Sequence, residues 1–242
     1  MIYEYSFEDN KKLFITDSAA ELSELWAAGF YAIPLCLNEN YDEDKDNLPW
    51  PHSEYIVTNL EEIKLEDLHK IYKRLAKEPL HILSTERLTV REMTVDDVDD
   101  FYRIYSGEGI TDYMEPLFDN PEDERLYTRN YIEDIYKFYD YGLWTVIDKL
   151  SGQIIGRAGI SNRDGFDIPE LGFVIEKDYQ NKGLAYEVCS SILSYSKKEL
   201  GFSKIQALVN PNNAVSLHLL KKLGFEETND HFEDYMIMLW SS

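Results

Sequence analysis

The chain has 242 residues, of which 24 are Lys or Arg and 46 are Asp or Glu, so its formal net charge is −22. This excess of acidic residues argues against nucleic acid or an anionic membrane as the main partner and favours cationic substrates. The two cysteines, Cys36 and Cys189, indicate neither a disulfide framework nor a cysteine-based metal site.

The sequence indicates neither a membrane span nor a secretion signal. No apolar run reaches the length that would cross a bilayer. Residues 1–12 contain acidic and aromatic side chains where a signal peptide would have a basic start and an apolar core. A cytoplasmic location is therefore expected, without a membrane partner.

The first third of the chain predicts a small α/β unit. Residues 13–16 form an apolar strand, and Asp17 and Ser18 are both good N-caps for the helix that follows. Further strands are expected at residues 31–37 and 55–57. The order of strand, helix and strand predicts a small Rossmann-like βαβ domain.

Residues 39–46 form the densest acidic run. Asp42, Asp44 and Asp46 have the spacing of a calcium loop, but Asn47 stands where such a loop needs glycine. A solvated loop is the better interpretation.

A helical pattern over residues 61–76 ends at Glu78 and Pro79, where a linker begins. We therefore expect two domains, residues 1–83 and residues 84–242.

Residues 14–18, 27–29, 33 and 55–63 together resemble the C-terminal half of haloacid-dehalogenase (HAD) phosphatases. In that family the acidic residue after the strand helps to hold Mg²⁺. The Asp-x-Asp nucleophile strand is missing from this sequence, so no phosphoryl-enzyme can form. We therefore interpret Asp17 as a helix cap rather than a metal ligand, and the domain as a degenerate remnant used for packing.

Residues 84–242 predict a second α/β domain. Its expected strands are residues 87–93, 143–148, 153–160, 170–175, 204–209 and 235–240, and its expected helices are residues 95–106, 122–139, 186–200 and 217–223. The loop at residues 107–121 is rich in aromatic and acidic side chains. It suits either a lid over an amine acceptor or ordinary packing.

Residues 180–185, Gln-Asn-Lys-Gly-Leu-Ala, lie between a predicted strand and a predicted helix. The N–H groups of a first helical turn have no intrahelical partner, and with the helix dipole they form an anion site. Gly183 lets the backbone approach a ligand closely, and the small side chain of Ala185 allows a close approach at a second position. This segment predicts a phosphate-binding loop.

Three segments, in the same order, resemble motifs of the Gcn5-related N-acetyltransferase (GNAT) family and of its RimJ/RimL-like branch. Residues 180–185 resemble the Q/R-x-x-G-x-G/A loop, residues 210–225 the Asn-x-x-Asn-x-x-Ser turn, helix and "LGF" ending, and residues 85–92 the "TERL-x-x-R" opening strand. The resemblance covers residues 84–240. It implies an α/β fold with a mixed, mostly antiparallel sheet flanked by helices.

The same resemblance implies acetyl-CoA as cosubstrate, with its pyrophosphate at the loop and its pantetheine arm where two strands splay apart. The cofactor-binding residues that it implies are Val174, Ile175, Gln180, Asn181, Lys182, Gly183, Leu184, Ala185, Asn210 and Asn213. A solvated turn is the alternative for Lys182, and a turn with a helix cap is the alternative for the two asparagines.

Acetyl transfer to an amine needs a base, a polarised carbonyl and an acid. The resemblance implies that Glu170 is the base, that the backbone N–H of Val174 is the oxyanion donor and that Ser216 is the acid. Leu220 occupies the position at which many family members have a tyrosine acid. For Glu170, an exposed carboxylate at a strand end is the alternative.

The sequence thus predicts an acetyl-CoA-dependent N-acetyltransferase that acts directly on a primary amine of a small molecule or a peptide. The alternative is a non-catalytic acyl-CoA-binding or interaction module, because the tyrosine acid is missing and the first domain is degenerate. The five histidines have no ligand spacing, so no metal is expected. Assembly as a homodimer is left open.

Overall fold

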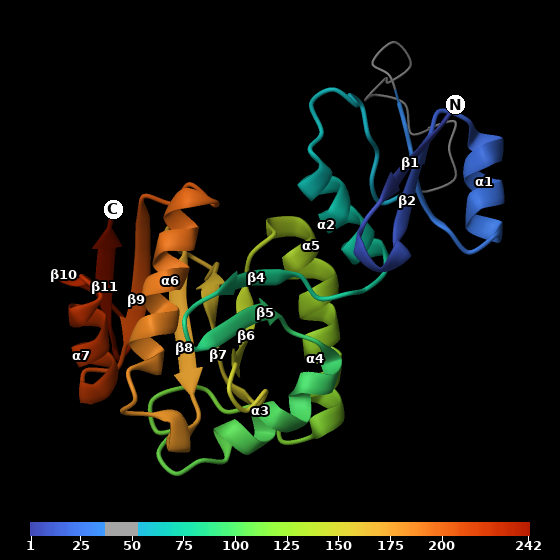
Figure 1. The fold of residues 1–242 in the computed structure, drawn as a ribbon. Coiled ribbons are helices and arrows are strands. Elements are labelled where there is room, and N and C mark those ends of the chain that lie inside the picture. The colour runs from blue at the N-terminus through green and yellow to red at the C-terminus, as the bar shows by residue number, and fades with distance from the viewer. Residues whose placement is uncertain (37–52) are drawn as a thin grey trace. The chain divides into compact units, whose positions relative to one another are not determined.

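A computed structural model describes residues 1–36 and 53–242. The chain divides into two compact units, Met1–Leu80 and His81–Ser242 (Figure 1). The calcium-like pattern at residues 42–46 and the last residue of the strand expected at 31–37 lie outside the described residues.

The first unit contains a three-stranded sheet in the order β1 (Ile2–Ser6), β2 (Lys12–Thr16), β3 (Tyr31–Pro34). β2 and β3 are parallel and are joined by α1 (Ala19–Ala27), which confirms the expected βαβ unit. β1 runs antiparallel to β2 and was not expected from the sequence. A second helix, α2 (Leu65–Leu75), follows.

Successive side chains of β2 point to opposite faces of this sheet. Leu13 and Ile15 pack in one buried cluster with Leu68 of α2. Phe14 packs in a separate cluster with Leu22 of α1. The two helices therefore cover opposite faces. Of the strand expected at residues 55–57, only Val57 pairs, through a parallel bridge to Leu35.

The N-cap of α1 is Ser18, whose Oγ accepts a hydrogen bond from the Glu21 N–H at 3.4 Å. Asp17 pairs instead with the amino group of Met1, so the interpretation of Asp17 as the helix cap is wrong. This ion pair lowers the pKa of Asp17. Within the described residues, no cluster of three or more His, Cys, Asp or Glu side chains could hold a metal ion.

Ser18→Ala is expected to lower the free energy of unfolding by about 1 kcal/mol, because the first turn of α1 loses its side-chain acceptor. Asp17→Asn is the matched control and should cost less, since its carboxylate makes only an exposed ion pair. Urea unfolding of both variants checks this. A larger loss for Asp17→Asn would contradict the assignment of the cap.

The second unit is built on an eight-stranded sheet. Its strands, in spatial order, are β10 (Glu226–Phe232), β11 (Tyr235–Ser241), β9 (Lys204–Val209), β8 (Glu170–Ile175), β7 (Ile154–Ser161), β6 (Leu143–Asp148), β5 (Leu88–Glu92) and β4 (His81–Ser84). All neighbours are antiparallel except β8 and β9. The predicted mixed, mostly antiparallel sheet is confirmed. Because β4 pairs with β5, residues 81–83 belong to this sheet, a few residues before the boundary expected at 83/84.

The helices of this unit are α3 (Val98–Tyr105), α4 (Pro121–Asn130), a π-helical turn (Tyr131–Tyr136), α5 (Lys137–Tyr139), α6 (Leu184–Lys198) and α7 (Ala214–Lys222). Short 3-10 turns are present at Val95–Asp97 and Lys177–Tyr179 in this unit and at Glu8–Asn10 in the first unit. α6 packs against β7 and β8, and α3 packs against β7. In the described part of the chain, no helix is long and apolar enough to cross a membrane.

A buried carboxylate, Asp97, ties α3 to the sheet. Its two oxygens accept from the two terminal nitrogens of Arg91 on β5, each at 2.7 Å, and from Thr145 Oγ1 on β6 at 2.7 Å. The backbone N–H of Thr94 adds a further bond at 3.0 Å. Burial alone would raise the pKa of Asp97, but these hydrogen bonds outweigh it and hold the pKa below its ordinary value.

Candidate active site

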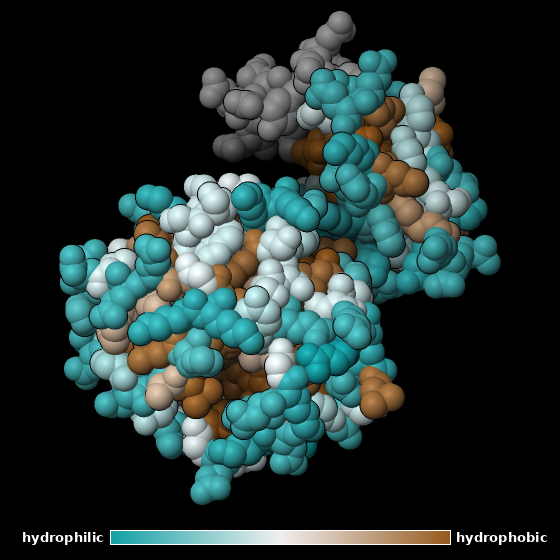
Figure 2. All heavy atoms as spheres, turned by 60° about the vertical axis from the view of Figure 1, so that its left-hand side comes forward, coloured by the Kyte–Doolittle hydropathy of each residue, from teal (hydrophilic) through white to brown (hydrophobic). Residues whose placement is uncertain are grey.

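β8 and β9 pair only at their beginning, where the Gln206 N–H donates to the Pro169 carbonyl at 2.8 Å. Beyond Glu170 the two strands separate, as the sequence led us to expect. A cavity of about 1150 Å³ lies along this gap and continues beneath the loop before α4. Figure 2 shows hydrophobic patches between rows of hydrophilic residues on one face of this unit.

This cavity brings together every predicted site residue except Lys182. Lining it are Glu170, Val174, Ile175, Gln180, Asn181, Gly183, Leu184, Ala185, Asn210, Asn213 and Ser216. The Lys182 ammonium lies 4.9 Å from the centre of the Tyr179 ring. Its position in the loop is therefore explained by packing on that ring.

The loop before α6 has the backbone of an anion site. Asn181 and Gly183 both have positive φ, 59° and 77°, so the chain turns sharply into the helix. The first intrahelical bond runs from the Glu187 N–H to the Gly183 carbonyl at 3.0 Å. The three N–H groups before Glu187 therefore have no helical acceptor. The Gln180 amide donates to the Ile175 carbonyl at 2.9 Å and so braces the loop against β8.

Two further residues, Arg87 and Glu187, hold this loop in place. The sequence alone predicted no role for either of them. Arg87 donates to the Lys182 carbonyl at 2.9 Å and, through Nε, to Glu187 at 2.7 Å. Glu187 also accepts from the Arg87 N–H at 2.9 Å and from the Thr85 hydroxyl. Although burial raises the pKa of Glu187, these bonds lower it overall. Thr85 and Arg87 belong to the opening segment that resembled the RimJ/RimL-like branch, which was the available signal.

The strand alternation of β8 decides which backbone N–H groups face the gap. The Glu176 N–H donates to Ile155 on β7 at 2.7 Å, and Val174 is the register partner of Arg157 on β7. Because N–H groups alternate in direction along a strand, the Val174 N–H points to β7 as well. The N–H groups of Phe173 and Ile175 point toward the gap. The geometry thus favours these two donors over Val174.

The candidate base Glu170 is 12% exposed and is ion-paired with Arg163 in the loop after β7. Arg163 Nε lies 2.5 Å from one carboxylate oxygen, and Nη2 lies 3.4 Å from the other. This pair raises the pKa of the guanidinium above its ordinary value. Glu170 is therefore not a free strand-end carboxylate, and an amine that uses it has to displace Arg163 or approach beside it.

The turn into α7 uses the asparagine oxygens for structure. Asn213 Oδ1 caps the helix by accepting from the Ser216 N–H at 3.0 Å, and Asn210 Oδ1 accepts from the Asn212 N–H at 2.9 Å. Their amide nitrogens have no hydrogen-bond partner among the described residues. Leu220, which replaces the usual tyrosine acid, is 1% exposed and forms part of the cavity wall.

The far end of the cavity is formed by the loop after α3 and by α4. Tyr113, Met114 and Phe118 line it from the loop, and Glu124 and Tyr127 line it from α4. The buried Glu124 accepts from the Phe118 N–H at 3.2 Å, which fixes the end of the loop on the helix. The loop at 107–121 therefore lines the cavity, and its role as a lid over an amine acceptor stays a prediction.

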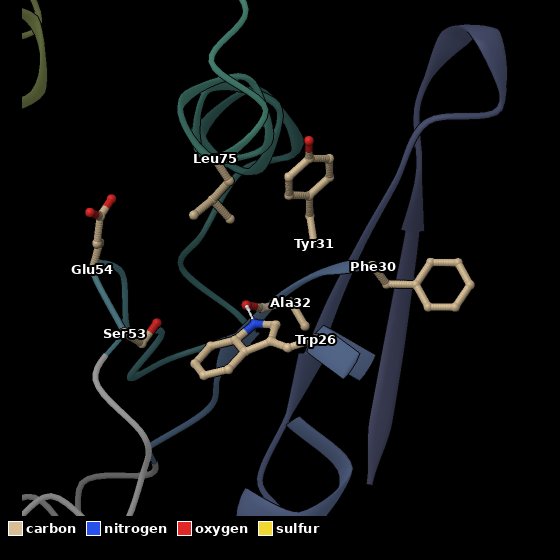
Figure 3. Close-up of a pocket in the computed structure, with 7 residues that line it drawn as sticks. All are labelled: Trp26, Phe30, Tyr31, Ala32, Ser53, Glu54 and Leu75. Carbon is tan, nitrogen blue, oxygen red and sulfur yellow. Dashed lines mark hydrogen bonds between the residues drawn. The ribbon is translucent and has the colours of Figure 1, made fainter. Parts of the chain in front are cut away.

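The first unit has its own small hollow, of about 140 Å³ (Figure 3). Its lining residues are Trp26, Phe30, Tyr31, Ala32, Ser53, Glu54 and Leu75. The Trp26 indole donates to the Ala32 carbonyl at 2.9 Å, which holds the ring in the wall. Asp17 is not part of this lining, so the hollow gives no support to a phosphatase site.

The family model "Acetyltransferase (GNAT) domain" matches residues 87–226. An uncharacterized N-acetyltransferase, YnaD of Bacillus subtilis, is 30% identical over 146 residues, covering 60% of this chain and 82% of the relative. The [ribosomal protein uS5]-alanine N-acetyltransferase of Escherichia coli is 34% identical over 103 residues, covering 42% of this chain and 50% of the relative.

Solved structures give the same fold. The spermidine N-acetyltransferase of Vibrio cholerae, in complex with CoA and spermine, superposes with a TM-score of 0.53 at 23% identity, covering 64% of this chain and 95% of that one. At this identity the likeness concerns the fold alone. The match of the family model begins after β4, so the resemblance of the first unit to HAD phosphatases stays a prediction.

Proposed function

Because the chain belongs to the acetyltransferase (GNAT) domain family and is thereby a transferase, we propose that it moves the acetyl group of acetyl-CoA directly to a primary amine. The observation that carries this proposal is the loop at 180–183, which ends in a left-handed Gly183 at the start of a 15-residue helix and opens into the cavity. The alternative of a non-catalytic binding module has no support from the relatives.

The residues of the loop fit a diphosphate. Unpaired N–H groups at the start of α6 and the positive end of the helix dipole favour an anion. A Cβ added to Gly183 would lie 3.6 Å from an Arg87 nitrogen, so a side chain would grow into the space beside the loop. The cosubstrate supplies the acetyl thioester. Phe173 and Ile175 would hold its arm by their backbone groups, with the side-chain amides of Asn210 and Asn213 opposite them.

The reaction forms a nitrogen–carbon bond and breaks a carbon–sulfur bond, while one proton leaves the amine and one reaches the thiolate. Glu170 would accept the first proton, directly or through water, once the amine replaces Arg163 as its partner. Ser216 would donate the second. A backbone N–H of β8, from Phe173 or Ile175, would stabilise the developing negative charge on the carbonyl oxygen.

Gly183→Asp is expected to weaken acetyl-CoA binding by well over tenfold, about 1.4 kcal/mol or more, because it adds a Cβ and a negative charge beside the diphosphate. Isothermal titration calorimetry measures the affinity, and free-thiol release measures turnover with a panel of amines.

Gly201→Asp is the matched control, because Gly201 follows the other end of α6 with nearly the same φ, 73° against 77°, and does not line the cavity. Both variants suffer the same backbone strain. Unchanged affinity in a folded Gly183→Asp protein, or an equal loss of affinity in both variants, would contradict the assignment of this loop as the diphosphate-binding site.

A further inference from the structure

Arg157 is a charged residue in the middle of an apolar strand. β7 reads Ile-Ile-Gly-Arg-Ala-Gly-Ile-Ser, and every residue between its two ends is buried. Arg157 itself is 5% exposed, yet it lines the cavity. Removing a guanidinium from water is costly unless an anion and further hydrogen bonds compensate it.

The described surroundings of Arg157 do not provide that anion. Its guanidinium lies 4.7 Å from the centre of the Phe101 ring, and its Nε has no hydrogen-bond partner. Burial raises the pKa of the nearby Tyr105, and the charge of Arg157 together with a hydrogen bond between the two side chains opposes that rise, but the Tyr105 hydroxyl is a neutral partner. The buried Glu124 is not ion-paired with it. The free energy that a cation–π contact contributes is smaller than the free-energy cost of desolvating an arginine.

The other lysines and arginines of the cavity wall are occupied. Arg163 is paired with Glu170, and Lys177 donates to the Glu108 carbonyl at 3.2 Å. The Lys222 ammonium lies 4.5 Å from the centre of the Tyr186 ring. Among the described lining residues, Arg157 is thus a buried cation that has no paired carboxylate and whose Nε–H is left for a ligand.

Arg157 also lies next to the place of reaction. It is the register partner of Val174, whose neighbours Phe173 and Ile175 turn their N–H groups into the gap. A group bound by Arg157 is therefore one strand away from the thioester. Glu170 lines the same cavity, so a group that could bind an anion and a candidate base share it.

We propose that Arg157 binds the carboxylate of the acceptor and that the acceptor is an α-amino acid, whose amino and carboxylate groups are close enough to reach the thioester and Arg157 together. This inference rests on the proposed acetyl transfer and names its substrate class. A peptide N-terminus or a polyamine has no carboxylate beside its reactive amine and would leave the guanidinium uncompensated.

The test compares glycine, serine, leucine, phenylalanine, glutamate and lysine, each with its own carboxamide, and includes spermidine. Rates are referred to the concentration of free amine, because a carboxamide lowers the basicity of the neighbouring amine. For at least one pair, wild-type kcat/KM for the acid is expected to exceed that for the carboxamide and for spermidine by tenfold or more, which corresponds to about 1.4 kcal/mol.

Arg157→Gln is expected to remove this preference, mainly through a higher KM for the acid, and to change the rate with the carboxamide less than threefold. Arg157→Lys should restore part of the preference. Arg129→Gln, the same change at an exposed site on α4, is the control and should keep wild-type values. Acetyl-CoA affinity measured by calorimetry reports whether each variant is folded.

A wild-type enzyme that acetylates carboxamides or spermidine as well as the acids overturns the inference, whatever the variants do, and leaves the proposed function intact. Equal losses for acid and carboxamide in a folded Arg157→Gln enzyme overturn it too. If acetyl-CoA binds but none of these amines is acetylated, both the inference and the proposed transfer to an amine fail.

Discussion

Replacing Glu170 by glutamine is expected to lower kcat/KM about a hundredfold near neutral pH. An alkylamine is mostly protonated there, and the glutamine keeps the shape of the side chain but cannot accept a proton. As pH rises and free amine accumulates, the activity of the variant should recover in part. A pH profile of kcat/KM by free-thiol release, for wild type and variant, measures both effects.

Because Glu170 is also the partner of Arg163, the variant removes an ion pair together with a base. Arg163→Gln separates the two roles, since it breaks the same pair and leaves the carboxylate in place. If proton transfer matters, Arg163→Gln keeps most of the activity at neutral pH. A Glu170→Gln enzyme within about threefold of wild type across the pH range, or equal losses in both variants, would make Glu170 a structural carboxylate.

The parts of the site that could be predicted are those that one short segment determines. The turn and helix start at 180–185 depend on local chemistry, namely a residue with left-handed φ and the free N–H groups of a first turn. The same holds for the Asn213 cap of α7. Such features need no knowledge of which strands become neighbours, so the sequence was sufficient to anticipate them.

Which backbone N–H groups of β8 face the gap was harder to predict. The residues lining the gap, Val174 and Ile175, were placed on the correct strand, but which N–H groups face the gap depends on the register with β7. That register follows from pairs such as Arg157 with Val174, which one sequence does not reveal. Phe173 was overlooked for this reason.

The partners of the charged residues could not be predicted, because they depend on how separate segments fold together. Glu187 pairs with Arg87 about a hundred positions away, and Glu170 pairs with Arg163 seven positions away only because the loop after β7 folds back. Local helix chemistry likewise could not decide between Asp17 and Ser18, since both residue types are good caps; in the structure Ser18 is the cap and Asp17 pairs with Met1. For Arg157 the sequence does carry a signal, namely an arginine within an otherwise apolar strand.

Asp97→Asn is expected to lower the free energy of unfolding by about 3 kcal/mol. The new amide would put a donor where the carboxylate accepted from Arg91, Thr94 and Thr145, and Arg91 would lose its anion. We expect the lower end of the range for a broken buried pair because Asp97 is 3% exposed while Arg91 keeps partial access to water. Urea unfolding followed by tryptophan fluorescence, to which the buried Trp144 contributes, measures the loss.

Asp99→Asn is the matched control, since its carboxylate is 77% exposed and pairs with Arg125 on the surface. It should cost less than about 1 kcal/mol. The pH dependence adds a second readout. Because the folded pKa of Asp97 is depressed below its ordinary value of 3.8, its stabilisation is present above that value and is lost as pH falls through the folded pKa. Wild type should therefore lose more stability than Asp97→Asn in that acidic range. Equal costs for the two substitutions, or parallel acid profiles, would mean that the Asp97 network does not stabilise the unit.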